Sequence, residues 1–132
     1  MDAPAAPQLY LVTPPDFEPE AFADSLDAVL GGCEIACVRL ALATRDEGRL
    51  IRAAEACREV TSPRDVALVI AEHVALCARL GLDGVHLTGP RGVRAARKQL
   101  GAEAIVGASC GASRHDGMTA GEAGADYVAL DR

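Results

Sequence analysis

The sequence predicts an α/β fold of repeated βα units around a parallel sheet. The chain has 132 residues, of which 50% are hydrophobic and 24% are charged, a composition typical of one soluble globular domain. Short apolar runs alternate with longer amphipathic stretches, which is the pattern of βα units. Two segments, GLDGVHL at 81–87 and GADYVAL at 124–130, share a layout in which a helix stop precedes a strand. This repetition indicates one architecture along the chain.

Six strands are expected, each a short apolar run rich in β-forming residues. In chain order they cover residues 9–13, 35–42, 66–71, 84–87, 104–109 and 127–130. The amphipathic stretches between them predict five helices, most of which end at glycine because glycine adopts the left-handed conformation of a helix C-terminus without strain. These helices cover 19–30 (before Gly31 and Gly32), 45–60, 73–80 (before Gly81), 92–100 (before Gly101) and 113–123 (before Gly124).

The number of strands limits the architectures that the sequence can form. A closed eight-stranded βα barrel usually needs about 200 residues or more, and this sequence reaches only a sixth strand. An open sheet would leave unpaired backbone groups on its first and last strands, whose apolar residues favour edge pairing. Three interpretations are compatible with this: a fragment of a longer chain, a sheet completed by association, or an open doubly wound sheet. We favour the fragment, a single domain over 1–132 with a flexible lead-in at 1–8 and strands seven and eight absent.

Composition excludes several classes of partner. The chain has 13 basic and 19 acidic residues, and its net charge of −6 would repel nucleic acid and anionic membranes on average. A base-stacking platform is excluded by the scarcity of aromatic residues. No apolar run approaches the roughly 18 residues of a membrane span, so we expect a cytoplasmic protein. The aromatic residues are Tyr10, Phe17, Phe22 and Tyr127.

The cysteines are expected to be reduced thiols in the core. Their odd number and scattered apolar surroundings do not indicate a disulfide framework. Cys33 and Cys37 could form half of a metal site, but no histidine or second cysteine pair follows at suitable spacing. Small buried hydrophobic side chains are therefore the favoured interpretation for Cys33, Cys37, Cys57, Cys77 and Cys110.

Candidate site residues follow the strands, because parallel βα folds place their chemistry at the carboxyl ends of strands. Glu72 could hold a magnesium ion that bridges substrate phosphates, or it could simply favour the dipole of the next helix. His86 alternates with Val85 and Leu87, so it faces either the barrel interior or the helix layer, as a ligand or as a satisfied structural residue. Ser109 could donate its hydroxyl to a phosphate oxygen, although serine is also common where strands meet loops.

Other motifs carry less information. The basic residues Arg91, Arg94, Arg97 and Lys98 have helical spacing, which predicts an exposed face, with a phosphate-binding patch as the alternative. The sequence contains neither G-x-G-x-x-G nor G-x-x-x-x-G-K-[ST], so it gives no support to dinucleotide or P-loop nucleotide binding.

Six segments taken in order resemble the thiamine phosphate synthase and TenI-like family of βα barrels. They are LYLVT at 9–13, CVRL at 37–40, GLDGVHL at 81–87, AIVGASC at 104–110, SRH at 113–115 and AGEAGADYVA at 120–129. The resemblance implies a TIM-type βα barrel, incomplete as given, with six of its eight strands. Such enzymes join a pyrimidine methyl pyrophosphate to a thiazole phosphate through a pyrimidine carbocation, with magnesium on the leaving pyrophosphate. TenI-like relatives instead tautomerise the thiazole carboxylate phosphate.

The resemblance also implies roles for single residues. Position 72, where the family has the aspartate of an Asn-Asp pair, keeps a carboxylate, so Glu72 is the candidate magnesium ligand. His86 matches a position near the pyrimidine, and Ser109 matches one at the pyrophosphate. The family's Q-L-R-x-K pattern falls on 39–43, and a shift of two residues would make Arg39 its arginine. Arg39, His86 and Ser109 are therefore the candidate substrate-binding residues.

At other positions the sequence departs from the family pattern. Without the shift, Ala41 and Ala43 replace the basic pair that grips pyrophosphate. Arg91 stands where G-Q-x-D has its magnesium-binding aspartate, which reverses the charge there. Gly111 stands where the tautomerases have a histidine. We therefore expect a synthase-family protein of thiamine biosynthesis with an impaired site. A non-catalytic binding or regulatory paralogue, which could be a homo-oligomer, is the alternative, and a thiazole tautomerase is disfavoured.

Overall fold

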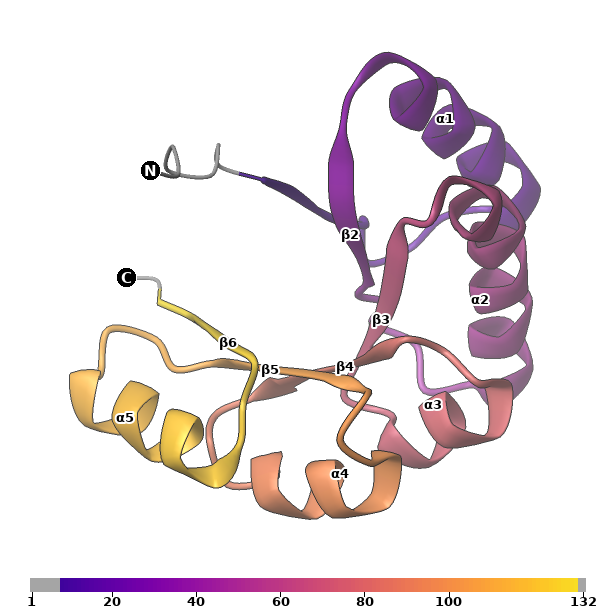
Figure 1. Ribbon diagram of the computed structural model, residues 1–132. Coiled ribbons are helices and arrows are strands. Elements are labelled where there is room, and N and C mark those ends of the chain that lie inside the picture. Colours follow the sequence, from indigo (N-terminus) through magenta and orange to yellow (C-terminus); the bar gives the residue numbers. More distant parts are fainter. Residues whose placement is uncertain (1–7, 131–132) are drawn as a thin grey trace, which may run out of the picture.

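The computed structural model describes residues 8–130 as a six-stranded parallel sheet with strand order β1-β2-β3-β4-β5-β6. The sheet curves into a half barrel with its helices on the convex side (Figure 1). The elements are β1 (Leu9–Val12), α1 (Pro19–Gly32), β2 (Ile35–Leu40), α2 (Glu47–Thr61), η1 (Ser62–Arg64), β3 (Ala67–Ala71), α3 (Val74–Leu80), β4 (Gly84–Thr88), α4 (Val93–Leu100), β5 (Ile105–Ser109), α5 (Arg114–Ala123) and β6 (Tyr127–Ala129).

This arrangement confirms the predicted alternation and the barrel-type fold, and the doubly wound interpretation is wrong. Each strand pairs with the next one in the chain, so every right-handed crossover carries its helix to the same face of the sheet. A doubly wound sheet would have helices on both faces. The predicted lead-in at 1–8 lies outside the described residues except for Gln8.

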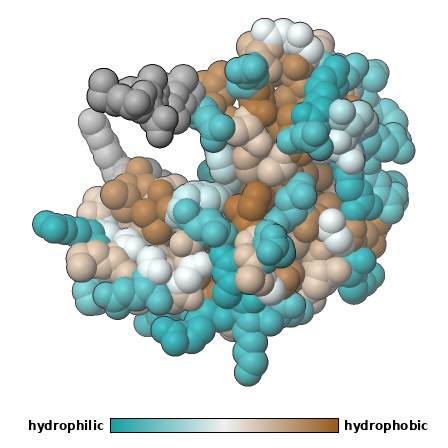
Figure 2. Space-filling view, in the orientation of Figure 1, coloured by the Kyte–Doolittle hydropathy of each residue, from teal (hydrophilic) through white to brown (hydrophobic). Residues whose placement is uncertain are grey.

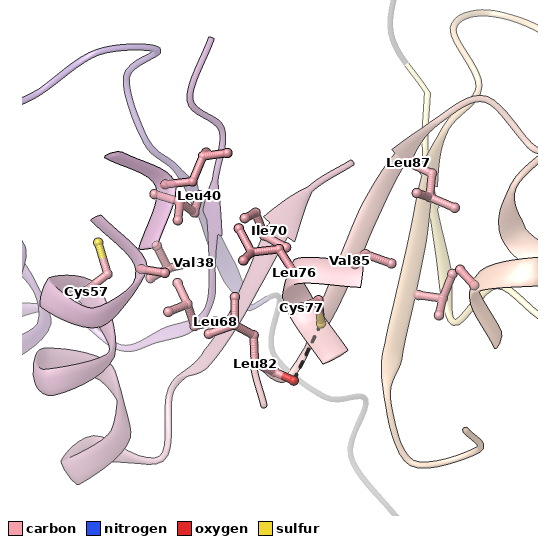
Figure 3. Close-up of a cluster of buried hydrophobic side chains, with 14 of the residues drawn as sticks. Val38, Leu40, Cys57, Leu68, Ile70, Leu76, Cys77, Leu82, Val85 and Leu87 are labelled. Atoms are coloured by element: carbon pink, nitrogen blue, oxygen red, sulfur yellow. Dashed lines mark hydrogen bonds between the residues drawn. The ribbon is translucent and has the colours of Figure 1, made fainter. Parts of the chain in front are cut away.

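The main hydrophobic core fills the space between the sheet and its helices. Alternate strand residues such as Val38, Leu68 and Val85 point outward and are buried against the helices (Figure 3). Leu50 of α2 and Leu76 of α3 belong to the same cluster. Burial of apolar surface here stabilises the half barrel by roughly 25 cal/mol per Å². The convex face of the sheet is therefore fixed by packing.

Element ends differ from the sequence prediction where side chains bond to the backbone. The strand predicted at 35–42 ends at Leu40, because the Ala41 amide donates to Thr13 Oγ1 at 2.9 Å instead of to a neighbouring strand. The helix predicted from residue 45 begins at Glu47, since the Asp46 carboxylate accepts from the Arg49 amide at 3.1 Å and caps it. α1 continues through both glycines that were expected to stop it and ends at the Cys33 cap.

The internal repeat corresponds to a carboxylate that joins neighbouring strands. Asp83 precedes β4, and its Oδ2 accepts from the Leu68 amide of β3 at 2.7 Å. Asp126 precedes β6, and its Oδ2 accepts from the Val106 amide of β5 at 2.8 Å. Leu68 and Val106 are buried, so each aspartate satisfies a backbone donor that water does not reach.

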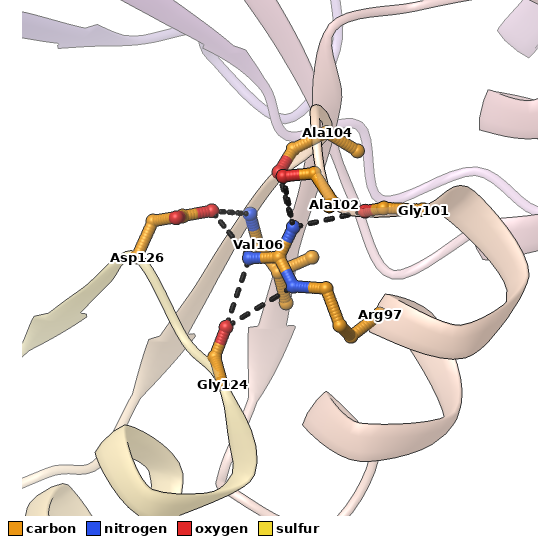
Figure 4. A network of polar contacts seen from close by, with 7 residues as sticks. All are labelled: Arg97, Gly101, Ala102, Ala104, Val106, Gly124 and Asp126. Carbon is orange, nitrogen blue, oxygen red and sulfur yellow. Dashed lines mark hydrogen bonds and ion pairs between the residues drawn. The ribbon is translucent and has the colours of Figure 1, made fainter.

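Arg97 extends the second of these joints. Its guanidinium donates to the carbonyl oxygens of Gly101, Ala104 and Gly124 and pairs with Asp126 at 2.6 Å (Figure 4). The expectation that the basic residues of this helix form an exposed face is therefore wrong for Arg97, whose side chain is only 21% exposed. Arg91, Arg94 and Lys98 are exposed. The guanidinium of Arg97 is thus held by contacts within the fold.

Four of the cysteines, Cys37, Cys57, Cys77 and Cys110, are buried free thiols, as expected. Cys33 is also a free thiol, but its predicted burial is wrong because it lies exposed at the end of α1. No helix between residues 8 and 130 is long and apolar enough to cross a membrane.

The outer strands of the sheet carry exposed apolar side chains. Leu9 and Val12 of β1 are 56% and 46% exposed, and Val128 of β6 is 38% exposed. Figure 2 shows apolar side chains gathered over β6 and α5, where Met118 and Leu130 are also exposed. Both outer strands thus have the apolar character that the sequence indicated.

Replacing Asp83 by alanine should lower the free energy of unfolding by about 1–3 kcal/mol, since the buried Leu68 amide loses its acceptor. Urea denaturation followed by circular dichroism measures this. The control is Asp24→Ala, which removes an exposed carboxylate on α1 and should change stability by about 0.5 kcal/mol or less. Equal effects of the two substitutions would contradict the structural role of Asp83.

Candidate functional site

The concave face of the half barrel collects the polar side chains of alternate strand residues. Parallel pairing keeps partner residues on one face, and the register joins Ala71 to His86, His86 to Gly107, and Gly107 to Tyr127. It also joins Thr88 to Ser109 at the carboxyl ends of β4 and β5. His86 therefore faces the barrel interior, which decides between its two predicted orientations.

Both ring nitrogens of His86 have hydrogen-bond partners. The side chain of His86 is 3% exposed, its Nδ1 lies 2.8 Å from Tyr127 Oη, and its Nε2 lies 2.6 Å from Ser109 Oγ. The Tyr127 ring stacks on the imidazole at a centroid separation of 5.6 Å. The structure thus brings two of the predicted site residues, His86 and Ser109, into direct contact.

His86 is neutral at physiological pH. Burial, helped by the charge of Arg39 and opposed by that of Glu72, lowers the pKa of the imidazole to about 4. A neutral imidazole donates one hydrogen bond and accepts one. His86 can therefore satisfy both neighbours but carries no proton to release near pH 7.

Arg39 introduces a positive charge into this interior. Its guanidinium carbon lies 5.4 Å from the centroid of the Tyr10 ring. Its Nε is buried and has no hydrogen-bond partner within residues 8–130, and no carboxylate of these residues forms an ion pair with it. An unpaired charge that is partly removed from water attracts an anion. Arg39 is thus suited to bind a negatively charged ligand.

Two tyrosines complete the interior group, and sequence reasoning missed both. Tyr10 of β1 and Tyr127 of β6 contact each other through their hydroxyl groups, with ring centroids 5.4 Å apart. Burial raises the pKa of both phenols, so both are protonated. Strand alternation could have placed Tyr127 inside. Its neighbour Val128 faces outward, so Tyr127 and Ala129 share the inner face. The contact between strands 117 residues apart left no signal in the sequence.

Glu72 lies at the carboxyl edge of the sheet, and its side chain joins two strand ends. Its backbone is left-handed, with φ of 73°, and its Oε1 accepts from the Thr88 amide at 2.6 Å. The carboxylate bonds to β4, whereas among the described residues no side chain caps the first turn of α3, where Glu72 could have acted as a helix-start charge. A pocket of about 550 Å³ beside it is lined by Leu42, Ala43, Thr44, Arg45, Ala71, Glu72, His73 and Thr88.

The residues that line this pocket offer few ligands for a magnesium ion. Within residues 8–130, no group of three or more histidine, cysteine, aspartate or glutamate side chains is placed to hold a metal ion. Glu72 is the single carboxylate lining the pocket, and one of its oxygens already accepts a backbone hydrogen bond. Magnesium is usually held by one or two carboxylates together with phosphate oxygens and water. The residues that line the pocket thus supply at most one carboxylate ligand, Glu72, which also bonds to the Thr88 amide.

Three kinds of comparison agree on the relationship of this chain. A family model described as thiamine monophosphate synthase matches residues 9–131. The chain is similar to the thiamine-phosphate synthases of Rhodospirillum centenum, at 47% identity over 124 residues, and of Erythrobacter litoralis, at 41% over 127. Each alignment covers 93% of this chain, and it covers 60% and 59% of the two relatives. The chain therefore spans about 60% of the length of these relatives.

The fold also has a solved counterpart. A thiamine phosphate pyrophosphorylase from Pyrococcus furiosus superimposes with a TM-score of 0.78 at 22% identity, over 93% of this chain and 59% of that one. At this identity the match establishes the fold.

The neutral His86 should make stability depend on pH. The unfolded chain takes up a proton near the ordinary pKa of 6.5, which the folded state resists down to about 4. The contribution of His86 is therefore complete above pH 6.5 and falls as the pH drops toward 4. Urea midpoints at about pH 7 and about pH 5.5 measure the loss.

Two variants separate His86 from other titrating groups. His86→Gln should flatten the difference between the two pH values, whereas His115→Gln, which changes an exposed imidazole, should keep it. The same pH dependence in wild type and His86→Gln would contradict a neutral buried imidazole.

Proposed function

Because the chain belongs to the thiamine monophosphate synthase family, we propose that its concave site binds the phosphorylated thiamine precursors and couples them only weakly. The precursors are the pyrimidine methyl pyrophosphate and the thiazole phosphate. The observation that carries this proposal is the unpaired Arg39 beside the His86–Ser109 pair at a carboxyl edge that has a single pocket carboxylate. Such a site has groups that bind an anion but few groups that stabilise the pyrophosphate as it leaves.

Binding is assigned to Arg39 and Ser109. Arg39 supplies positive charge from within the half barrel, and Ser109 supplies a hydroxyl at the carboxyl end of β5. A phosphate oxygen would give the guanidinium the partner that it lacks within residues 8–130. His86 is assigned to the pyrimidine side by the family resemblance, and its neutral ring fits contact with an uncharged heterocycle.

Weak coupling is assigned to the carboxyl edge. Bond breaking to a carbocation leaves negative charge on the pyrophosphate, so groups that stabilise this charge lower the barrier. Ala41 and Ala43 offer no charge there, and Arg91 replaces a metal-binding aspartate of the family pattern. Groups of this kind contribute about 3–4 kcal/mol each, so losing several costs several powers of ten in rate.

A binding or regulatory role without catalysis is the second candidate. It is favoured by the two hydrogen bonds that hold His86, because a ring engaged at both nitrogens is a poor proton carrier. The tautomerase function has less support, since Gly111 stands at the position of its histidine and His86 is already engaged. The two candidates differ in the turnover that they predict.

A coupling assay distinguishes them. With both precursors and magnesium, the full chain should form thiamine phosphate at least about a thousandfold more slowly than the Rhodospirillum centenum synthase measured in parallel. The triple substitution Ala41→Arg, Ala43→Lys and Arg91→Asp should raise the rate. Arg94→Asp, at an exposed position near Arg91, makes the same charge change as Arg91→Asp and is the control for that part of the triple substitution. A wild-type rate equal to that of the relative would overturn the proposal that the site is impaired.

Binding is tested separately by calorimetric titration with the pyrimidine pyrophosphate. Arg39→Met and Ser109→Ala should each weaken binding by about tenfold or more, the effect of losing a hydrogen bond to a charged group. Arg94→Met serves as the matched control, because it removes an exposed arginine from α4. Equal affinities of wild type and Arg39→Met would show that the anion binds elsewhere.

A further inference from the structure

Four side chains from four strands form a continuous hydrogen-bonded row across the half barrel. Tyr10 of β1 contacts Tyr127 of β6 through the two hydroxyls, Tyr127 Oη lies 2.8 Å from His86 Nδ1, and His86 Nε2 lies 2.6 Å from Ser109 Oγ. The row begins beside Arg39 and ends at the carboxyl edge of the sheet. Each member has at most one hydrogen to donate, so fixing the direction of one bond fixes the whole row.

Two directions are conceivable, and they differ at the ends of the row. In the first, Tyr10 donates to Tyr127, Tyr127 donates to Nδ1, and Nε2–H donates to Ser109, whose own hydrogen stays free. In the second, every bond is reversed, and the free hydrogen lies on Tyr10. The neutral His86 permits both directions, because either ring nitrogen can carry its single hydrogen.

Arg39 favours the first direction. Its guanidinium lies over the Tyr10 ring, so the electrostatic field there attracts oxygen lone pairs and repels a hydroxyl hydrogen. The Tyr10 hydroxyl contacts the Tyr127 hydroxyl, and the Cys37 thiol is a second neighbour of Tyr10. Tyr10 therefore donates to Tyr127 and keeps its free lone pairs for the cation.

We propose that Tyr127 is a positioning residue that holds His86 as the Nε2–H tautomer and thereby leaves the Ser109 hydroxyl hydrogen free to donate to a phosphate oxygen. This inference rests on the proposed function in that it takes the ligand to be a phosphate or pyrophosphate anion. With the reverse direction, Ser109 would use its hydrogen on His86 and present only lone pairs to the anion. The orientation of a single imidazole thus decides whether Ser109 attracts or repels the ligand.

Packing holds Tyr127 in place for this role. A Cβ atom on Gly107 would lie 2.0 Å from Tyr127 Cζ, so the ring occupies the space that any side chain at position 107 would take. The ring also stacks on His86 with an angle of 26° between the planes. Gly107 pairs with both residues in the sheet register, which puts the phenol and the imidazole on one face. The hydroxyl is therefore held at Nδ1 by the sheet itself.

The tautomer can be measured directly by ¹⁵N NMR of the histidine side chains in the full chain. His86 should appear as the Nε2–H tautomer in the wild type, identified as the signal lost in His86→Gln. Tyr127→Phe keeps the ring on Gly107 but removes the hydroxyl, so His86 should lose its preference for the Nε2–H tautomer and inorganic pyrophosphate should bind about tenfold more weakly. The signals of His73 and His115 report that the variant remains folded.

Ser109→Ala is the matched control. It removes the donor to the anion but leaves Tyr127 in place, so pyrophosphate binding should weaken while His86 keeps the Nε2–H tautomer. An Nδ1–H tautomer in the wild type, or an unchanged Nε2–H tautomer in folded Tyr127→Phe, would overturn the positioning role. The expected tautomers in a chain that does not bind pyrophosphate would support the direction of the row and overturn the proposed function.

Discussion

The structure depends on the register of its parallel sheet, in which each strand pairs with the next one in the chain. Sequential pairing carries every crossover helix to one side, so one set of alternate residues is buried under helices. The other set faces inward, and it includes Arg39, His86 and Ser109. A slip of one residue in any strand would exchange the two sets. The same constraint therefore builds the hydrophobic core and selects the residues of the site.

Carboxylates at strand starts hold this register. Asp83 and Asp126 each accept from the amide of the second residue of a neighbouring strand, and Arg97 of α4 connects the second joint to Ala104, just before β5. Their contacts lie at the amino ends of the strands, away from the pocket at the carboxyl edge. Stability and ligand contact are thus assigned to opposite ends of the sheet, so the carboxyl edge can change without loss of the fold.

The interior combines a satisfied polar row with an unsatisfied charge. Tyr10 bonds to Tyr127, and the buried His86 bonds to Tyr127 and Ser109, so neither nitrogen of the imidazole lacks a partner. Arg39 differs, because its buried Nε has no partner among the residues from 8 to 130. Its field lowers the pKa of His86 and favours one direction of the row. The interior of the described part of the chain therefore carries an unpaired positive charge beside a row of satisfied polar groups.

The sequence by itself determined the alternation of strands and helices, the repeat around Asp83 and Asp126, and the placement of Glu72, His86 and Ser109 near strand ends. These follow from local periodicity and from short motifs, which the chain carries residue by residue. The family resemblance added the barrel and the expected chemistry. Two predictions were wrong. α1 continues through Gly31 and Gly32, which were expected to stop it, and Cys33, which was expected to be buried, is exposed at the end of that helix.

Only the tertiary structure decided which face His86 occupies, that Glu72 bonds to Thr88, and that Tyr10 and Tyr127 meet inside the half barrel. These contacts join residues between 16 and 117 positions apart. Their partners are chosen by sheet curvature and register, and no single segment of sequence contains that information. Local propensity determines which residues form strands, whereas the curvature of the sheet around a common interior determines which side chains meet there.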